Sequence, residues 1–122
     1  MARGDIVLVD IPAPPGGQGH EQAGERPALV IHSDGSSGQL PVLMIIPFTT
    51  NLNALRYPHT IRVEPSPRNG LAQASILLVF QLRAIDKRRL GRRLGYLERE
   101  LLEHVETEIA HLLSLEPSSS TA

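Results

Sequence analysis

The chain has 122 residues, of which 41% are hydrophobic, and a formal net charge of −1. This length is typical of one domain with a single core, and leaves no room for a second domain of ordinary size. Aromatic residues make up 3% of the chain and Trp is absent, so the core must be aliphatic. The absence of Cys excludes disulfides, thiolate metal sites and a cysteine nucleophile. Because the net charge is close to zero, any attraction for nucleic acid must be local.

The beginning of the chain lacks the features of a signal peptide. A strand-like pattern starts directly after Arg3-Gly4, in place of a charged lead, a long apolar segment and a small-residue cleavage site. No apolar run approaches the ~20 residues that a membrane helix needs. We therefore expect a cytoplasmic protein that has no membrane partner.

The first third of the chain predicts strands around a long loop. A β-branched apolar run over residues 5–11 predicts a buried strand. Three prolines and three glycines then occupy residues 11–19 and predict a long exposed loop. Residues 27–33 and 40–48 predict a hairpin, because the turn-forming cluster 34–38 lies between them.

The middle of the chain predicts two further strands. Residues 51–58 read as a connection, and the alternation of polar and apolar residues over 59–64 predicts a half-buried strand. Breakers over 65–70 end it. Residues 75–84 predict one further continuous strand.

The last third predicts a short strand and the chain's clearest helix. Asp86 is placed to cap a short basic turn that reaches about Leu90, and residues 93–97 predict a strand. Residues 98–115 predict an amphipathic helix without a clear N-cap residue. Its apolar face consists of Leu101, Leu102, Val105, Ile109, Leu112 and Leu113.

Together these elements predict a mainly β protein with helices (α+β). Short strands joined by Gly/Pro turns and closed by one helix are typical of a small curved antiparallel sheet or a partly closed barrel. We expect residues 1–116 to form a single domain, and the Ser-rich residues 117–122 to form a disordered tail.

The first cluster of chemically capable residues lies where the long loop meets the second strand. Glu21, Glu25 and Arg26 directly precede the apolar run 28–31. Pro27 biases Arg26 toward an extended conformation and so limits where its guanidinium can lie. Taken alone, these residues are explained more simply by a solvated Glu–Arg pair at a strand entrance, worth no more than ~1 kcal/mol.

The second cluster ends an apolar strand. Thr49, Thr50 and Asn51 place two hydroxyls and an amide there, which are neutral groups suited to phosphate or to base edges. The same residue types are also ordinary at strand ends and turns.

The third cluster combines a strand pattern with positive charge. Ser75, Gln81 and Arg83 have odd numbers, so in one continuous strand their side chains point to the same side unless a bulge intervenes. Seven of the twelve Lys and Arg residues fall within residues 83–99. Such a run of charge is also typical of a solvated face.

Taken together, three stretches of the chain resemble the MazF/PemK family of toxins. Residues 19–31, 47–51 and 75–90 carry the resemblance in family order, and it extends from Arg3-Gly4-Asp5 to the amphipathic run before Leu115. It implies a small curved antiparallel SH3-like barrel of the CcdB/MazF (PemK-like) type with a C-terminal amphipathic helix, in a symmetric homodimer. It also implies the toxin component of a type II toxin–antitoxin system, acting as a metal-independent endoribonuclease without a cofactor.

The resemblance implies roles for individual residues. Arg26 matches the Arg-Pro that enters the second strand and Thr49 matches the Thr that closes the third, so both are expected to be catalytic. Glu21 matches an acidic position of the same family stretch and is the third residue expected to be catalytic. The expected RNA contacts are His20, Gln22, Thr50, Asn51, Ser75, Gln81 and Arg83, with Gln81 and Arg83 left open between substrate contact and scaffold support.

Two residues depart from the family pattern. Phe80 stands where relatives commonly have a polar or acidic residue, and His20 stands where a small residue is frequent. The Pro/Gly loop is also longer and richer in glycine than usual. These departures affect the RNA sequence preference more than the chemistry.

The implied reaction is attack of the RNA 2′-hydroxyl on the adjacent phosphodiester, giving a 2′,3′-cyclic phosphate and a 5′-hydroxyl. Arg26 fits the role of phosphate clamp and Thr49 that of a hydrogen-bond donor, while Glu21 or His20 could serve as general base. The substrate is expected to be single-stranded RNA, most simply mRNA, because in-line attack needs a free backbone. The implied protein partner is an antitoxin with an acidic, partly disordered segment.

Two alternatives share the expected fold. CcdB-type relatives bind gyrase and do no chemistry, and a binding protein on this fold could have lost its activity. The presence of both Arg26 and Thr49 favours the endoribonuclease over the gyrase-binding alternative.

Overall fold

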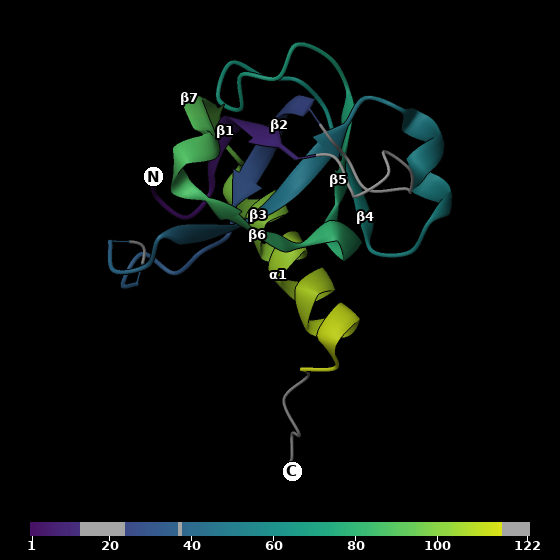
Figure 1. Ribbon diagram of the computed structural model, residues 1–122. Helices are drawn as coiled ribbons and strands as arrows, with labels where there is room; N and C mark the ends of the chain where they lie inside the picture. Colours follow the sequence, from purple (N-terminus) through teal and green to yellow (C-terminus); the bar gives the residue numbers. More distant parts are fainter. Residues whose placement is uncertain (13–23, 37, 116–122) are drawn as a thin grey trace.

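The computed structural model describes residues 1–12, 24–36 and 38–115. Its strands form one antiparallel sheet in the order β4-β5-β3-β2-β1-β7, with β6 paired to β3. Helix α1 packs on one side of the sheet, and its C-terminal end projects beyond it (Figure 1). The elements are β1 (Asp5–Ile11), β2 (Gly24–Val30), β3 (Val42–Thr49), η2 (Leu52–Arg56), β4 (Thr60–Val63), β5 (Ser75–Leu78), η3 (Val79–Gln81), β6 (Arg83–Asp86), η4 (Lys87–Arg89), β7 (Leu90–Tyr96) and α1 (Arg99–Leu113).

Most of the predicted elements are present. The first strand, the hairpin of β2 and β3, the strand β4 and the C-terminal helix are confirmed. Asp86 caps the short basic turn η4 as expected, since its side chain accepts a hydrogen bond from the backbone N–H of Arg88. Helix α1 has no side-chain N-cap at Glu98, also as expected. The predicted loop 11–19, beyond its first two residues, and the predicted tail 117–122 lie outside the described residues.

The prediction of one continuous strand over residues 75–84 is wrong. The chain forms β5, turns through the 3-10 helix η3 and continues as β6. Phe48 pairs with Leu77, whereas Ile45 pairs with Arg83, so the two registers differ by three residues, which is the length of η3. An odd shift of register exchanges the faces of a strand. Ser75 and Arg83 therefore lie on opposite faces of the sheet.

Strand β3 is the centre of the sheet. One edge pairs with β2, while the other pairs first with β6 over Val42–Ile45 and then with β5 at Phe48 and Thr49. Its run of apolar residues allows burial on both faces, as a central strand requires. Strand β3 therefore changes its partner on this edge between Ile45 and Phe48.

Two apolar layers cover the faces of the sheet. The larger one lies between the sheet and α1, where Val105 is fully buried and Leu101, Leu102, Ile109 and Leu112 pack around it. The opposite layer contains Val7, Val9, Ala28, Val30, Leu43 and Ile45. Leu113, which was expected on the packed face of the helix, is 50% exposed, because the end of α1 extends past the sheet.

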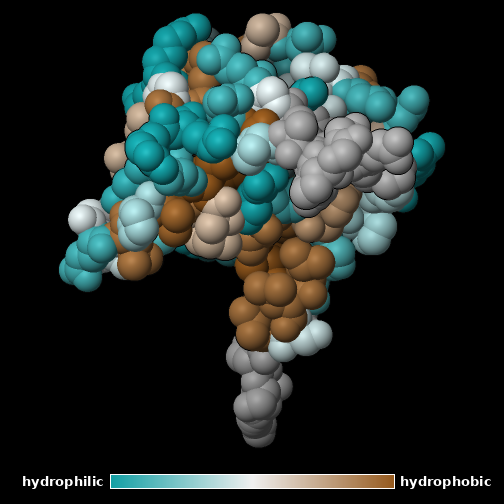
Figure 2. Space-filling model, in the orientation of Figure 1, coloured by the Kyte–Doolittle hydropathy of each residue, from teal (hydrophilic) through white to brown (hydrophobic). Residues whose placement is uncertain are grey.

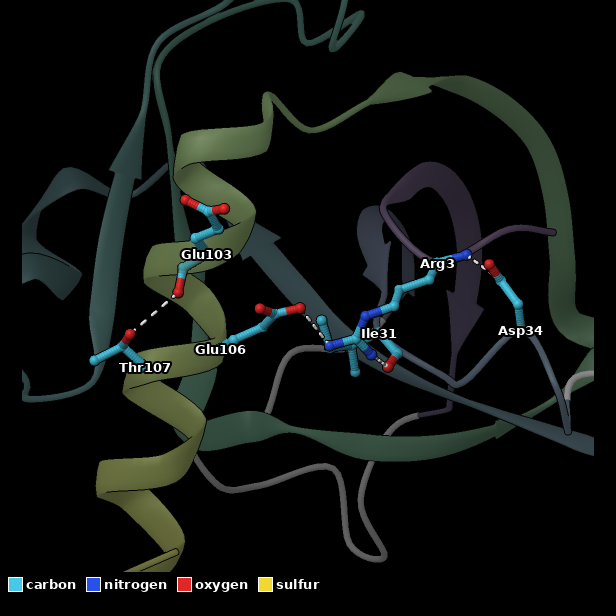
Figure 3. A network of polar contacts seen from close by, with 6 residues as sticks. All are labelled: Arg3, Ile31, Asp34, Glu103, Glu106 and Thr107. Atoms are coloured by element: carbon cyan, nitrogen blue, oxygen red, sulfur yellow. Dashed lines mark hydrogen bonds and ion pairs between the residues drawn. The ribbon is translucent and has the colours of Figure 1, made fainter. Parts of the chain in front are cut away.

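Arg3 ties the start of the chain to the helix. Its backbone N–H donates to Asp34 Oδ1 at 2.7 Å, and its guanidinium donates to the Ile31 carbonyl and to Glu106 Oε2, the latter at 2.7 Å. Figure 3 shows the guanidinium reaching from the sheet to α1, beside the intrahelical bond from Thr107 to the Glu103 carbonyl. These contacts fix the position of α1 against the end of β2.

Gly95 allows the loop before Leu71 to lie directly against β7. A Cβ atom at Gly95 would be 2.1 Å from the Arg68 carbonyl oxygen and 2.7 Å from the Asn69 carbonyl carbon. We expect Gly95→Ala to lower the free energy of unfolding by about 3 kcal/mol, because backbone rather than a flexible side chain has to move. Urea denaturation measures this, with Gly38→Ala as the control, since a Cβ atom there meets nothing within 4 Å. Equal losses in the two variants would contradict the close approach.

Candidate active site

The register between β2 and β3 relates the two residues expected to be catalytic. Ala28 pairs with Pro47 and Val30 with Ile45. The pairing ends at Ala28 and Pro47, two residues short of Arg26 on β2 and of Thr49 on β3. Side chains two residues apart on a strand point to the same face, so Arg26 is expected on the face of Ala28, and Thr49 on the face of Pro47, at the same end of the two strands.

Thr49 lies where β3 ends and has one unused hydrogen-bonding capacity. The residue is 7% exposed, and its Oγ1 accepts a hydrogen bond from the Asn51 backbone N–H at 3.2 Å. Within residues 1–12, 24–36 and 38–115 the hydroxyl donates to no acceptor. Its proton can therefore be donated to a bound group.

The two residues after Thr49 turn the chain into η2. Thr50 is exposed. Asn51 caps η2, because its Oδ1 accepts a hydrogen bond from the Asn53 backbone N–H at 3.1 Å. The side-chain oxygen of Asn51 therefore accepts the N-cap hydrogen bond, while its side-chain nitrogen remains a donor group.

A pocket of about 460 Å³ opens beside Thr49. It lies between the end of β3, the turn η2 and the start of η3, and it includes three of the expected site residues. The lining residues are Thr49, Asn51, Asn53, Ala54, Arg56, Tyr57, Leu78, Phe80 and Gln81. Residues 51–58 have the sequence pattern of a connection, which gave no indication that Asn53, Arg56 and Tyr57 line a pocket. The departure of Phe80 from the family pattern was the one signal in the sequence that pointed to this part of the pocket.

Three other expected site residues are not part of the pocket lining. Ser75 is buried on the opposite face from the pocket, where its hydroxyl donates to the Gln73 carbonyl at 2.9 Å. Arg83 pairs with Ile45 on β3, so it shares a face with Thr49 but lies four residues along the strand, a separation of roughly 13 Å. Arg26 is half-buried on β2, next to the undescribed segment.

The remaining expected residues, His20, Glu21 and Gln22, lie in the segment 13–23, outside the described residues. Both candidates for the general base are among them. Their roles therefore stay predictions from the sequence.

The arginine-rich segment after Arg83 is largely paired with carboxylates. Arg88 binds Asp86 at 3.0 Å, Arg89 binds Asp10 at 3.3 Å and Arg93 binds Asp5 at 2.9 Å. Hydrogen bonds from the side chain and the backbone of Arg88 lower the pKa of Asp86 to about 2. The pairing favours a solvated charged surface over an open cationic track.

The described part of the chain contains no group of three His, Asp or Glu residues that could hold a metal ion. In the same residues no helix has the length and apolarity needed to cross a membrane. Neither observation involves Arg26 or Thr49, whose arrangement rests on the pairing of β2 with β3.

Comparisons with known proteins assign this fold. The family model of PemK-like, MazF-like toxins of type II toxin–antitoxin systems matches residues 2–113. Endoribonuclease MazF of Staphylococcus saprophyticus is 32% identical over 115 residues, which cover 94% of this chain and 92% of that protein. The crystal structure of MazF from Deinococcus radiodurans has a TM-score of 0.76 at 26% identity and covers 93% of this chain and 96% of its own. The MazE–MazF complex of the same organism has a TM-score of 0.71 at 26% identity, with 95% and 97% covered.

These matches define the fold and the family of the chain. The sheet, the C-terminal helix and the family model define a MazF-like fold, which confirms the predicted fold class. The chain belongs to the PemK-like, MazF-like toxins of type II toxin–antitoxin systems, as the sequence predicted. Within that family it is a homologue of endoribonuclease MazF.

Proposed function

We propose that this toxin cleaves single-stranded RNA, with mRNA as its target, without a metal ion. The 2′-oxygen attacks the neighbouring phosphorus and gives up its proton to a general base. The bond from phosphorus to the 5′-oxygen breaks, and that oxygen takes up a proton. The products are a 2′,3′-cyclic phosphate and a 5′-hydroxyl. The observation that supports this proposal is the antiparallel pairing of β2 with β3, which brings Arg26 and Thr49 toward the same end of neighbouring strands, with Thr49 in the wall of a pocket.

Arg26 and Thr49 stabilise the charge that develops on the phosphate. The cationic guanidinium of Arg26 can bind two phosphate oxygens at once. The Thr49 hydroxyl donates to a non-bridging oxygen or to the leaving oxygen. Such oriented donors act where negative charge increases in the transition state. Glu21 is the candidate general base, with His20 as the alternative.

RNA extends from this point along the face that carries both residues. Thr50, Asn51 and Gln81 lie at or near the pocket, and Arg83 lies on the same face on β6, opposite Ile45 of β3. His20 and Gln22 complete the proposed contacts from the preceding loop. The position of Ser75 on the opposite face favours a scaffold role for that residue.

The projecting end of α1 supports a homodimer. Leu113 and Leu115 are 50% and 64% exposed, next to the partly buried Ile109 and Leu112. Figure 2 shows this end as a continuous apolar surface below the sheet. We propose that a second copy covers it, because an apolar surface on a projecting helix end is typical of an interface.

The proposed protein partner is a cognate antitoxin with an acidic, disordered segment. The Deinococcus radiodurans relative is known in complex with MazE, which supports an equivalent partner here. An antitoxin that covers the RNA face would block cleavage. A cytoplasmic location belongs to the same proposal, because the proposed mRNA substrate is found there.

The test is cleavage of a mixed single-stranded RNA pool by the purified protein in excess EDTA. We expect cleavage to be unchanged by EDTA, and every new 5′ end to be a hydroxyl that kinase can label directly. Cleavage that requires added Mg²⁺, or products with 5′-phosphates, would refute the mechanism. No cleavage under any condition would favour a binding protein on this fold.

A further inference from the structure

The pocket beside Thr49 has an aromatic wall. Tyr57 and Phe80 meet edge to face, with ring centroids 5.7 Å apart and planes at 61°. The chain contains two Tyr, two Phe and no Trp, so half of its aromatic residues meet at this one pocket. Tyr57 is 37% exposed and Phe80 is half-buried, which leaves ring surface accessible from the pocket.

Arg56 holds the Tyr57 ring in place. Its guanidinium carbon lies 4.9 Å from the ring centroid, and its Nη2 donates to the Tyr57 hydroxyl at 3.0 Å. Two interactions with a neighbouring residue limit the rotation of the ring. The aromatic wall is therefore preorganised before a ligand binds, which reduces the conformational entropy lost on binding.

The polar groups of the pocket suit a neutral, planar ligand. Among the described residues that line the pocket there is no carboxylate, and the one cation there, Arg56, interacts with Tyr57. Asn51, Asn53 and Gln81 contribute side-chain amides, which bind the edges of bases. The pocket volume of about 460 Å³ lies within the range of roughly 300–1,000 Å³ found for small-ligand sites.

The pocket is continuous with the proposed cleavage site, because Thr49 forms part of its wall. A nucleotide whose phosphate contacts Thr49 can direct its base into the pocket. Proteins that recognise single-stranded RNA commonly stack splayed bases on aromatic rings and bind their edges with polar side chains.

We propose that this pocket binds one unstacked base next to the scissile phosphate and determines the base preference at that position. Tyr57 and Phe80 form the stacking surface, and the three amides contact the edge of the base. This inference depends on the proposed ribonuclease function. It adds Tyr57 and Phe80 as specificity-determining residues of the same site.

The first test compares cleavage of a randomised RNA pool by the parent protein and by Tyr57→Ala and Phe80→Leu, with the ends read by sequencing. Phe80→Leu keeps an apolar side chain but removes the aromatic face. We expect both variants to relax the preference at a single position beside the cut by about 10-fold, since stacking on an aromatic side chain has effects of that size. Tyr96→Ala is the matched control, because Tyr96 is also exposed and also has an arginine, Arg93, at 5.6 Å from its ring.

The second test measures binding without cleavage. Uniformly 2′-O-methylated oligonucleotides lack the nucleophile, and an abasic site is moved along them one position at a time. Fluorescence anisotropy should show a loss of affinity of about 10-fold at one position for the parent protein, and no loss at that position for Tyr57→Ala or Phe80→Leu.

The two tests separate the failure of this inference from the failure of the proposed function. If RNA is cleaved but both variants keep the parent preference and the parent abasic profile, the base pocket is refuted while the ribonuclease stands. If no RNA is cleaved but the abasic effect depends on Tyr57 and Phe80, the pocket stands and the proposed reaction is wrong. Thermal melting of each variant confirms that it is folded.

Discussion

Replacing Arg26 with Ala is expected to lower kcat/KM for RNA cleavage by at least 100-fold. The substitution removes the cation that we place against the phosphate as its negative charge increases. Losing one group that stabilises developing charge in an active site costs roughly 100- to 1,000-fold in rate. Initial rates on a short single-stranded RNA measure the effect.

Arg26→Lys tests whether the shape of the guanidinium contributes in addition to its charge. Lysine keeps the charge but cannot bind two phosphate oxygens in the planar geometry of arginine. We therefore expect Arg26→Lys to recover part of the lost rate. Arg99→Ala is the control, because Arg99 is 90% exposed on the first turn of α1. This substitution removes the same charge at a distant position. A similar loss in Arg99→Ala would indicate an effect of total charge and would contradict the clamp.

Thr49→Val is expected to reduce kcat by about 100-fold with little change in KM. Valine matches threonine in shape but has no hydroxyl, so it removes a donor that is used mainly in the transition state. Thr49→Ser keeps the donor and should retain most of the activity. Single-turnover cleavage at saturating protein measures the chemical step directly.

The Thr49 hydroxyl also accepts the bond from the Asn51 backbone N–H, so Thr49→Val could act through the fold. Melting temperatures of Thr49→Val and Thr49→Ser detect such an effect. Thr107→Val is the matched control, because its hydroxyl donates to the Glu103 carbonyl within α1, away from the pocket. Full activity in a folded Thr49→Val would remove Thr49 from the proposed reaction.

Local sequence signals were sufficient to predict most of the strands and the C-terminal helix. The apolar run of β1, the turn cluster between β2 and β3 and the spacing of leucines on α1 each determine an element by their own periodicity. The family resemblance added the MazF-like fold. It also named Arg26 and Thr49, whose roles stay predictions until the variants are measured.

The break in residues 75–84 had no comparable local signal. Apolar residues occupy 76–80 without interruption, a run that a strand accommodates equally well. The turn η3 arises because β5 pairs with the end of β3 and β6 with its beginning. The face on which Ser75 lies follows from that register, which depends on a strand almost thirty residues earlier in the chain.

The aliphatic core, the hairpin, the C-terminal helix and the family could all be predicted from the amino-acid sequence. Each of these depends on neighbouring residues or on residues in a fixed order. The fold itself was needed to show which side chains share a face, that Tyr57 and Phe80 meet beside Thr49, and that Leu113 and Leu115 at the end of α1 are exposed. The physical reason is that strand register and packing join residues far apart in the chain, and a one-residue difference in pairing moves a side chain to the opposite face.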